Sequence, residues 1–180
     1  MAVARAVLVF LVSTAQAWMP DTNARIHVKF DAEAPDVFLG HAYNSTEERY
    51  LRILDKDDFS LIVGGRNTVY NLSLYDLSEN VDQRIEWQST VAHRELCQLK
   101  GKSSDECQNY PRVAARSHGS ILVCGTNAYK PLCRRYSRPQ PKTHLEEFDG
   151  TGHCPYDPTH NSTAVFVGKY YYCARFDLLT

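Results

Sequence analysis

The sequence has 180 residues, of which 43% are hydrophobic and 23% charged, and its 20 basic and 21 acidic side chains leave a formal net charge of −1. This composition is typical of a globular chain, and it excludes both a disordered tail and a basic nucleic-acid-binding domain. The apolar run at residues 6–12 is far shorter than the roughly 18 residues that a transmembrane helix needs.

Residues 1–17 have the features of a secretory signal peptide. Arg5 precedes the apolar run, and the small-residue motif Ala15-Gln16-Ala17 follows it at the distance of a cleavage site. We therefore expect an exported mature chain, residues 18–180, that begins at Trp18. The alternative, a buried N-terminal strand or helix, leaves the cleavage motif unexplained.

Short strands separated by turn signals follow, as in an all-β fold. The expected strands cover residues 60–63, 69–75, 85–87, 120–125, 164–167 and 170–172. Glycines in residues 64–67 suit a hairpin turn, and Gly168-Lys169 suits a second one. Residues 93–99 allow at most a short helical turn. Residues 138–143 contain two prolines, which predict an exposed loop because proline lacks the backbone donor that a central strand needs.

Six cysteines in an exported chain indicate disulfide bonds. Cys97 and Cys107 enclose one polar segment, and Cys124 and Cys133 enclose another, so their spacing favours these two short-loop bridges. Each bridge of this size stabilises a fold by about 2–3 kcal/mol in the chain-entropy model. No Cys-x-x-Cys motif occurs, which argues against a structural zinc site.

Three N-x-S/T motifs without proline begin at Asn44, Asn71 and Asn161, and we expect all three to be glycosylated. Apolar and polar residues alternate within residues 69–75. A strand there would bury the apolar set and turn Asn71 outward, with its glycan in solvent.

Two charged clusters are interpreted as solvated surface. The aspartates within residues 55–58 lack the ligand and the glycine that an EF-hand loop requires at its later positions. The basic cluster comprises Lys130, Arg134, Arg135 and Arg138. Such a cluster could meet an acidic glycan, but the near-neutral overall charge favours a solvated face.

The remaining two cysteines leave an enzymatic alternative open. Cys154 and Cys173 form either a third disulfide or two thiols. Cys154 beside His153 would be the candidate nucleophile of a cysteine-based hydrolase, although a cystine is the more common state in an exported chain. We expect no catalytic activity, no metal site and no cofactor.

Several blocks of sequence resemble the N-terminal part of a sema domain, the defining domain of the semaphorins. The blocks are VGGRNTVYNLSLYDLSE (63–79), QRIEW (83–87), HRELCQLKGKSSDECQNY (93–110), LVCGTNAYKPLCRRY (122–136) and GTGHCPYDPTHNSTAVF (150–166). They occur in order between about residue 26 and residue 172, and the likeness is greatest to the invertebrate transmembrane class. The resemblance implies the same two pairings, Cys97 with Cys107 and Cys124 with Cys133.

The resemblance further implies a seven-bladed β-propeller, secretion, and recognition of plexin receptors that signals repulsion in axon guidance and cell migration. Full-length members of the family are expected to form homodimers. A propeller blade takes about 40–50 residues, and propellers close with about four to eight blades. We therefore expect an incomplete propeller that comprises the first two blades and the start of a third.

The expected incompleteness leaves a second functional hypothesis, a truncated secreted product that acts as a decoy or has no activity. In the family, the receptor-facing loops come largely from the third and fourth blades, so this chain alone should bind a plexin weakly. The resemblance assigns no receptor contact to a particular residue here. A longer product with the membrane helix of the family would be located at the plasma membrane.

Overall fold

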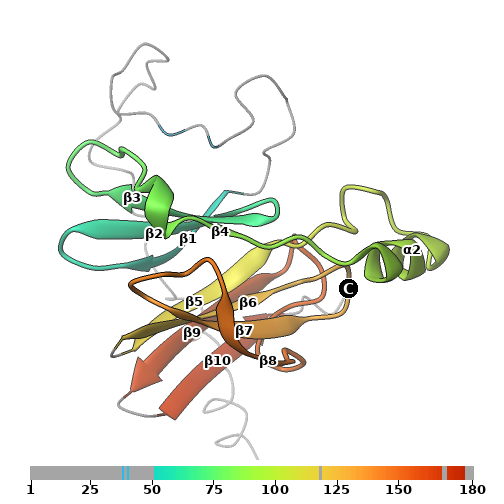
Figure 1. The fold of residues 1–180 in the computed structure, drawn as a ribbon. Helices are drawn as coiled ribbons and strands as arrows, with labels where there is room; N and C mark the ends of the chain where they lie inside the picture. Colours follow the sequence, from blue (N-terminus) through green and yellow to red (C-terminus); the bar gives the residue numbers. More distant parts are fainter. Residues whose placement is uncertain (1–37, 39, 41–50, 118, 168–169, 177–180) are drawn as a thin grey trace, which may run out of the picture. The chain divides into compact units, whose positions relative to one another are not determined.

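Three antiparallel β-sheets follow one another along the chain in the computed structural model (Figure 1), which describes residues 38, 40, 51–117, 119–167 and 170–176. The strand orders are β1-β2-β3-β4, β5-β6-β7-β8 and β9-β10. The strands are β1 Arg52–Lys56, β2 Ser60–Gly65, β3 Thr68–Ser73, β4 Ile85–Glu86, β5 Pro111–Ser117, β6 Ser120–Gly125, β7 Leu132–Ser137, β8 His144–Asp149, β9 Asn161–Val167 and β10 Tyr170–Phe176. The 3-10 helix η1 Val81–Gln83 precedes β4, and the α-helix α2 Val91–Leu99 follows it. The expected signal peptide and Asn44 lie outside the described residues.

Each four-stranded sheet is a meander in which consecutive strands pair as neighbours, as in a propeller blade. The first strand of the second sheet, β5, contacts both β1 and β9, which are the first strands of the other two sheets. First strands that meet in sequence order are the innermost strands of successive blades. The expected all-β partial propeller, with two blades and the start of a third, is therefore confirmed.

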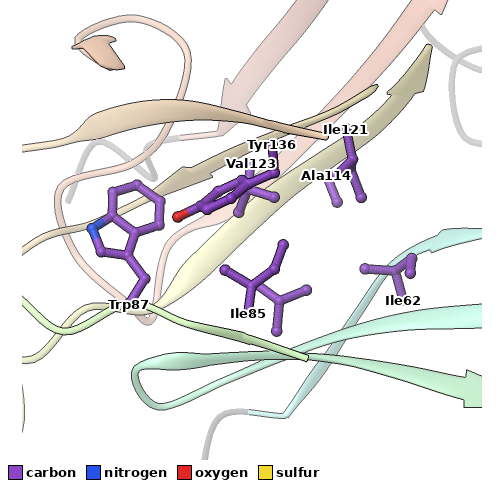
Figure 2. Packing of buried hydrophobic residues seen from close by; sticks show 8 residues of the cluster. Ile62, Ile85, Trp87, Ala114, Ile121, Val123 and Tyr136 are labelled. Atoms are coloured by element: carbon purple, nitrogen blue, oxygen red, sulfur yellow. The ribbon is translucent and has the colours of Figure 1, made fainter. Parts of the chain in front are cut away.

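A buried apolar cluster joins the first two sheets (Figure 2). Its members are Ile62, Val69, Ile85 and Trp87 from the first sheet and its continuation, and Ala114, Ile121, Val123 and Tyr136 from the second. Burial of one such large side chain contributes about 1.5–3 kcal/mol. This cluster thus lies between blades, so each of the two sheets needs the other to bury these apolar residues.

An arginine of the second sheet also reaches the first. The Nε atom of Arg116 on β5 lies 2.7 Å from Oδ2 of Asp55, and its guanidinium also pairs with Asp57. A further hydrogen bond of 3.1 Å runs from Nη1 to Oγ of Ser60. Burial lowers the pKa of Arg116, and the Asp55 carboxylate opposes this shift. The acidic stretch expected to be a solvated turn is therefore partly a binding site for Arg116.

The first hairpin forms where it was expected, but its turn residues differ. Both glycines belong to β2, and Arg66-Asn67 makes the turn, with Asn67 at φ 59°. Asparagine tolerates this left-handed conformation better than most residues. Gly64 has another role, because a Cβ atom there would lie 2.5 Å from the carbonyl oxygen of Pro111. The glycine permits close approach of the first two sheets.

The strand that carries the central glycosylation motif packs against other residues on both faces, so Asn71 is less exposed than a strand with one face in solvent would make it. Tyr70 and Leu72 pack on one side, as predicted. Val69, however, is only 2% exposed and belongs to the cluster between the sheets. Asn71 shares that face and is half-buried. Alternation alone could not reveal a second sheet on the polar side.

A nine-residue helix replaces the short turn expected at residues 93–99. Thr90 is the N-cap of α2, and its Oγ1 accepts a hydrogen bond from the backbone N–H of His93 at 3.3 Å. Such caps stabilise a helix by about 1 kcal/mol. By contrast, β6 has the bounds that were expected, and residues 138–143 form a loop as predicted. Pro111 occupies the first position of β5, where a missing donor is tolerated.

We predict that Gly64→Ala lowers the free energy of unfolding by about 1–3 kcal/mol, because the added methyl group collides with backbone and not with a movable side-chain end. The matched control is Gly101→Ala, which strains a backbone at φ +84° but meets no atom within 4 Å. Urea unfolding of the secreted chain, followed by tryptophan fluorescence, measures both. A loss for Gly64→Ala no larger than that of the control would contradict the close approach of the sheets.

Candidate functional site

Loops from all three sheets gather at one end of the strands and are joined by hydrogen bonds and ion pairs. We call residues 66–67, 88–110, 126–131 and 150–160 the loop cluster. These segments are the β2–β3 turn, the connection from β4 to β5 with α2, the β6–β7 loop and the β8–β9 connection. The sequence blocks that resemble the semaphorins include large parts of these loops.

One disulfide lies within the loop cluster, and a second lies at its border with β6 and β7. Cys97 of α2 is bonded to Cys107, with their Cα atoms 5.7 Å apart. Cys124 on β6 is bonded to its register partner Cys133 on β7, with a Cα–Cα distance of 4.0 Å. These are the two pairs that spacing and resemblance favoured. The first closes the segment that follows α2, and the second closes the β6–β7 loop.

Cys154 lies beside the second disulfide, 2% exposed, in a cluster with Val113, Leu122 and Phe148. The ring of its neighbour His153 packs edge-on against Phe148. This apolar setting is that of a structural cysteine and not of a reactive thiolate. Cys173 is opposite Ala164 in the β9–β10 register, and its side chain is outside what is described, so the third pairing stays a prediction.

The buried amide of Asn109 connects the loops of the first two sheets. Its Nδ2 donates to the carbonyl of Trp87 at 2.9 Å, and its Oδ1 accepts from the backbone N–H of Asn127 at 3.0 Å. Its own backbone pairs with Asn67 in both directions, at 2.9 Å and 2.7 Å. A Cβ atom at Gly125 would lie 2.2 Å from Oδ1. The amide therefore needs glycine at that position.

The β6–β7 loop contains three consecutive residues in the left-handed region, Asn127, Ala128 and Tyr129, with φ values of 43°, 56° and 59°. Non-glycine residues with positive φ are uncommon and are concentrated at functional sites. The surroundings hold this run in place. Asn127 is anchored through Asn109, and Ala128 is buried against the Cys97–Cys107 disulfide.

The run projects the Tyr129 hydroxyl between two carboxylates of different loops. The hydroxyl lies 2.5 Å from Oδ2 of Asp157 and 3.2 Å from Oε1 of Glu106. The ammonium of Lys102 lies 4.5 Å from the centre of the Tyr129 ring, 3.5 Å from Glu106 and 3.9 Å from Asp157. One phenol thus links the β6–β7 loop to the two segments on either side of it.

The same interactions shift the pKa values of Tyr129, Asp157 and Glu106. Burial and the two carboxylates raise the pKa of Tyr129 far above its usual value. Partial burial raises the pKa of Asp157, but hydrogen bonds from Thr159 and Tyr129 lower it more. The pKa of Asp157 therefore lies below its usual value. The Ser103 side chain and backbone N–H lower the pKa of Glu106. Both carboxylates therefore stay charged at neutral pH.

Arginines attach the third sheet to the other two. The guanidinium of Arg112, which is 4% exposed, donates from Nε and Nη2 to the carbonyl of Pro158 at 3.0 Å and 2.8 Å. Nη2 of Arg52 on β1 donates to the carbonyl of Ser162 on β9 at 3.1 Å. These contacts were not predicted, because isolated arginines in a sequence carry no sign of their partners.

The basic residues grouped in the sequence do not form one patch. Consecutive residues of a strand face opposite sides, and this separates the two arginines of β7. Nε of Arg134 contacts Glu147 at 2.6 Å, and Nε of Arg135 contacts Glu146 at 3.1 Å, both across to β8. Lys130 lies in the β6–β7 loop and Arg138 in the β7–β8 loop. This arrangement fits the expectation of a solvated face, and it adds that Glu147 and Glu146 pair with Arg134 and Arg135.

Among the described residues, no group of three or more His, Cys, Asp or Glu side chains is placed to hold a metal ion. No helix in the same part of the chain is long and apolar enough to cross a membrane. Many polar groups of the loop cluster are bonded to one another, and these bonds hold its segments together.

We predict that Asn109→Asp lowers the free energy of unfolding by about 2–4 kcal/mol at neutral pH, because a buried carboxylate would face the Trp87 carbonyl. The fold would raise the pKa of this new carboxyl. The loss of stability in Asn109→Asp should therefore become smaller as the pH falls, because the protonated carboxyl donates to that carbonyl. Asn109→Ala, which removes both bonds, is the control whose deficit should not vary with pH. Urea unfolding across the acidic range measures both, and equal pH profiles would contradict this role for the amide.

We also predict that Tyr129→Phe destabilises the chain by about 1–2 kcal/mol, since the hydroxyl donates to a charged carboxylate. The pKa of Asp157 is lowered in the folded state. The stabilisation by the Tyr129–Asp157 hydrogen bond is therefore fully present above the pKa that Asp157 has in the unfolded chain. It is lost as the pH falls through the folded value, which lies below 3.8. Tyr156→Phe, in the same connection, is the matched control. A Tyr129→Phe effect that persists fully in acid would show that the hydroxyl acts without Asp157.

The chain was compared with known proteins by sequence and by structure. No protein-family model matches the chain. Semaphorin-1A of Schistocerca americana is 49% identical over 174 residues, which cover 96% of this chain and 23% of the relative. Semaphorin-5B of Mus musculus is 41% identical over 142 residues, which cover 79% of this chain and 13% of the relative. The chain thus spans less than a quarter of the length of these two relatives.

Solved structures agree with the sequence relatives. A chain in the complex of Drosophila Plexin A with Semaphorin 1b is 46% identical, with a TM-score of 0.63 over 69% of this chain and 24% of that one. Extracellular domains 1-2 of Drosophila Semaphorin 1a are 39% identical, with a TM-score of 0.59 over 71% of this chain and 25% of that one. Since both sequence and fold match over most of its length, and the insect Semaphorin-1A relatives fit the class expected, the chain belongs to the semaphorin family.

Proposed function

We propose that this chain is the N-terminal part of the sema domain of an exported semaphorin that recognises a plexin and signals repulsion in axon guidance. The observation that carries the proposal is the similarity to a semaphorin solved in complex with Plexin A, with 46% identity. No catalytic role is part of the proposal. The signal peptide at residues 1–17 and glycosylation of Asn44 and Asn161 belong to it, because export is required for contact with a receptor.

The loop cluster supports a recognition function on physical grounds. Binding is strengthened when a surface is already ordered in the free protein, since less conformational entropy is lost on association. Two disulfides, the Asn109 amide and the Tyr129 hydroxyl order loops that would otherwise be mobile. The blades therefore present their loops in a set arrangement.

The described strands cover only the first part of the surface that a plexin would meet. The structure contains two four-stranded blades and the β9–β10 hairpin of a third, whereas the resemblance places the receptor-facing loops mainly on the third and fourth blades. We therefore infer that residues 18–180 alone bind a plexin weakly. Their main contribution is to support the blades that follow.

A chimera tests this proposal. The segment of Schistocerca Semaphorin-1A that aligns with residues 51–167 is replaced by the segment from this chain. We expect the chimera to be secreted as a monodisperse protein and to bind the Drosophila Plexin A ectodomain with an affinity within about tenfold of the unaltered relative, a change of about 1.4 kcal/mol. Surface plasmon resonance measures the affinity.

Two controls make the result interpretable. Residues 18–180 alone should bind at least about tenfold more weakly than the chimera. A chimera with Tyr75→Ala, which alters a side chain that is 96% exposed outside the loop cluster, should bind like the chimera itself. A chimera that is folded and secreted but shows no saturable plexin binding would overturn the proposal.

A further inference from the structure

We propose that an N-linked glycan on Asn71 is a structural part of the junction between the first two blades, where it joins η1 to the β7–β8 loop. This goes beyond receptor recognition and depends only on export of the chain. The argument rests on where the strand places the asparagine and on what surrounds it.

Asn71 is the first residue of the motif Asn71-Leu72-Ser73 and lies within β3, opposite Ile62 of β2 in the register. Its carbonyl accepts a hydrogen bond from the N–H of Asn80 at 2.8 Å. Its side chain shares the face of Val69, which looks toward the second sheet. The amide nitrogen that would carry a glycan is therefore directed into the space between two blades.

That space is a small crevice of about 50 Å³. Besides Asn71, its polar lining comes from Ser60 and Gln83 of the first sheet and its connection, and from Arg116 and Arg138 of the second. The volume accommodates a few atoms and no sugar ring. A glycan on Asn71 must therefore extend out of the crevice, and we infer that it does so past Gln83 and Arg138, which belong to the lining.

A larger hollow of about 640 Å³ lies against the same two segments. It is lined by Asp82, the neighbour of Gln83, and by Ser137, the neighbour of Arg138. Gln140 and Lys142 add further hydrogen-bonding groups. Ligand sites in proteins commonly have volumes of about 300–1,000 Å³. A glycan that leaves the crevice along these two segments would meet a hollow that has hydrogen-bonding groups and is large enough for its first sugars.

The order of the chain makes attachment feasible. Asn71 precedes the whole second sheet, which begins at Pro111, so the motif can be modified before that sheet covers it. In the transfer, Nδ2 of Asn71 bonds to C1 of the first sugar of a lipid-linked oligosaccharide. The bond from C1 to the lipid pyrophosphate breaks, Nδ2 loses one proton, and the lipid pyrophosphate leaves. Folding of the second sheet then encloses the new bond.

The first test measures occupancy and enclosure. The full chain is secreted from cells that make high-mannose glycans and is digested with trypsin, which releases residues 67–84 with Asn71 as their single motif. We expect this peptide to be glycosylated. Peptide N-glycosidase should remove the glycan from the folded protein at least about tenfold more slowly than from the unfolded one, because the second sheet partly covers the linkage and local opening is needed to expose it fully. An unmodified peptide, or equally fast release from both states, would overturn the proposal.

The second test asks whether the glycan holds the junction. The N–H of Arg138 donates to the carbonyl of Gly119 at 3.0 Å, so hydrogen exchange at Arg138 reports opening of the β7–β8 loop. Ser73→Ala, which abolishes the motif but keeps Asn71, should make this exchange about tenfold faster. Ser73→Thr keeps the motif and is the matched control, and Asn161→Gln removes a different motif and should have no effect.

Enzymatic trimming to a single sugar on the folded, unmutated chain gives the same readout when Ser73→Ala fails to fold. Trimming should accelerate exchange at Arg138, since it removes the sugars that occupy the hollow. Unchanged exchange after trimming and in Ser73→Ala would show that the glycan, though present, bridges nothing.

Discussion

The buried amide of Asn109 is the interaction on which the arrangement of loops depends. Loops that cross between sheets leave backbone groups that neither sheet can pair, and such groups cannot be buried without a partner. Asn109 supplies a donor to Trp87 and an acceptor to Asn127 from a single side chain. An amide is suited to this task because it carries both functions at one end. The glycine at residue 125 and the asparagine turn at residue 67 follow from its presence.

The sequence predicted features that are decided locally and missed those decided between sheets. The β6 strand and the two disulfides depend on neighbouring residues and short loops, and they were found. The orientation of Asn71 and the partners of Arg116 depend on a second sheet that a single strand pattern does not reveal. Helix α2 is longer than expected because its Thr90 cap and its tether at Cys97 stabilise the segment.

The candidate site was predictable in part for the same reason. The cysteines and the blocks of family-like sequence lie largely in the loops that the structure brings together. The ion pairs and the Tyr129 bridge could not be foreseen, since Glu106, Tyr129 and Asp157 come from three separate segments. The basic cluster adds a detail that the sequence did not show, because the pleat of β7 places Arg134 and Arg135 on opposite faces.

The contacts between blades divide into two kinds with different consequences. The apolar cluster around Trp87 and Tyr136 supplies most of the burial, but apolar packing by itself tolerates changes in relative orientation. Polar contacts of two arginines on β5 depend on the relative orientation of the blades. Arg116 binds Asp55 of the preceding blade, and Arg112 binds the carbonyl of Pro158 in the connection to the third sheet. Removal of one partner leaves a charge or a carbonyl without compensation, so these pairs penalise misaligned blades. Each of these arginines thereby fixes the angle between the blade that carries it and the neighbouring segment.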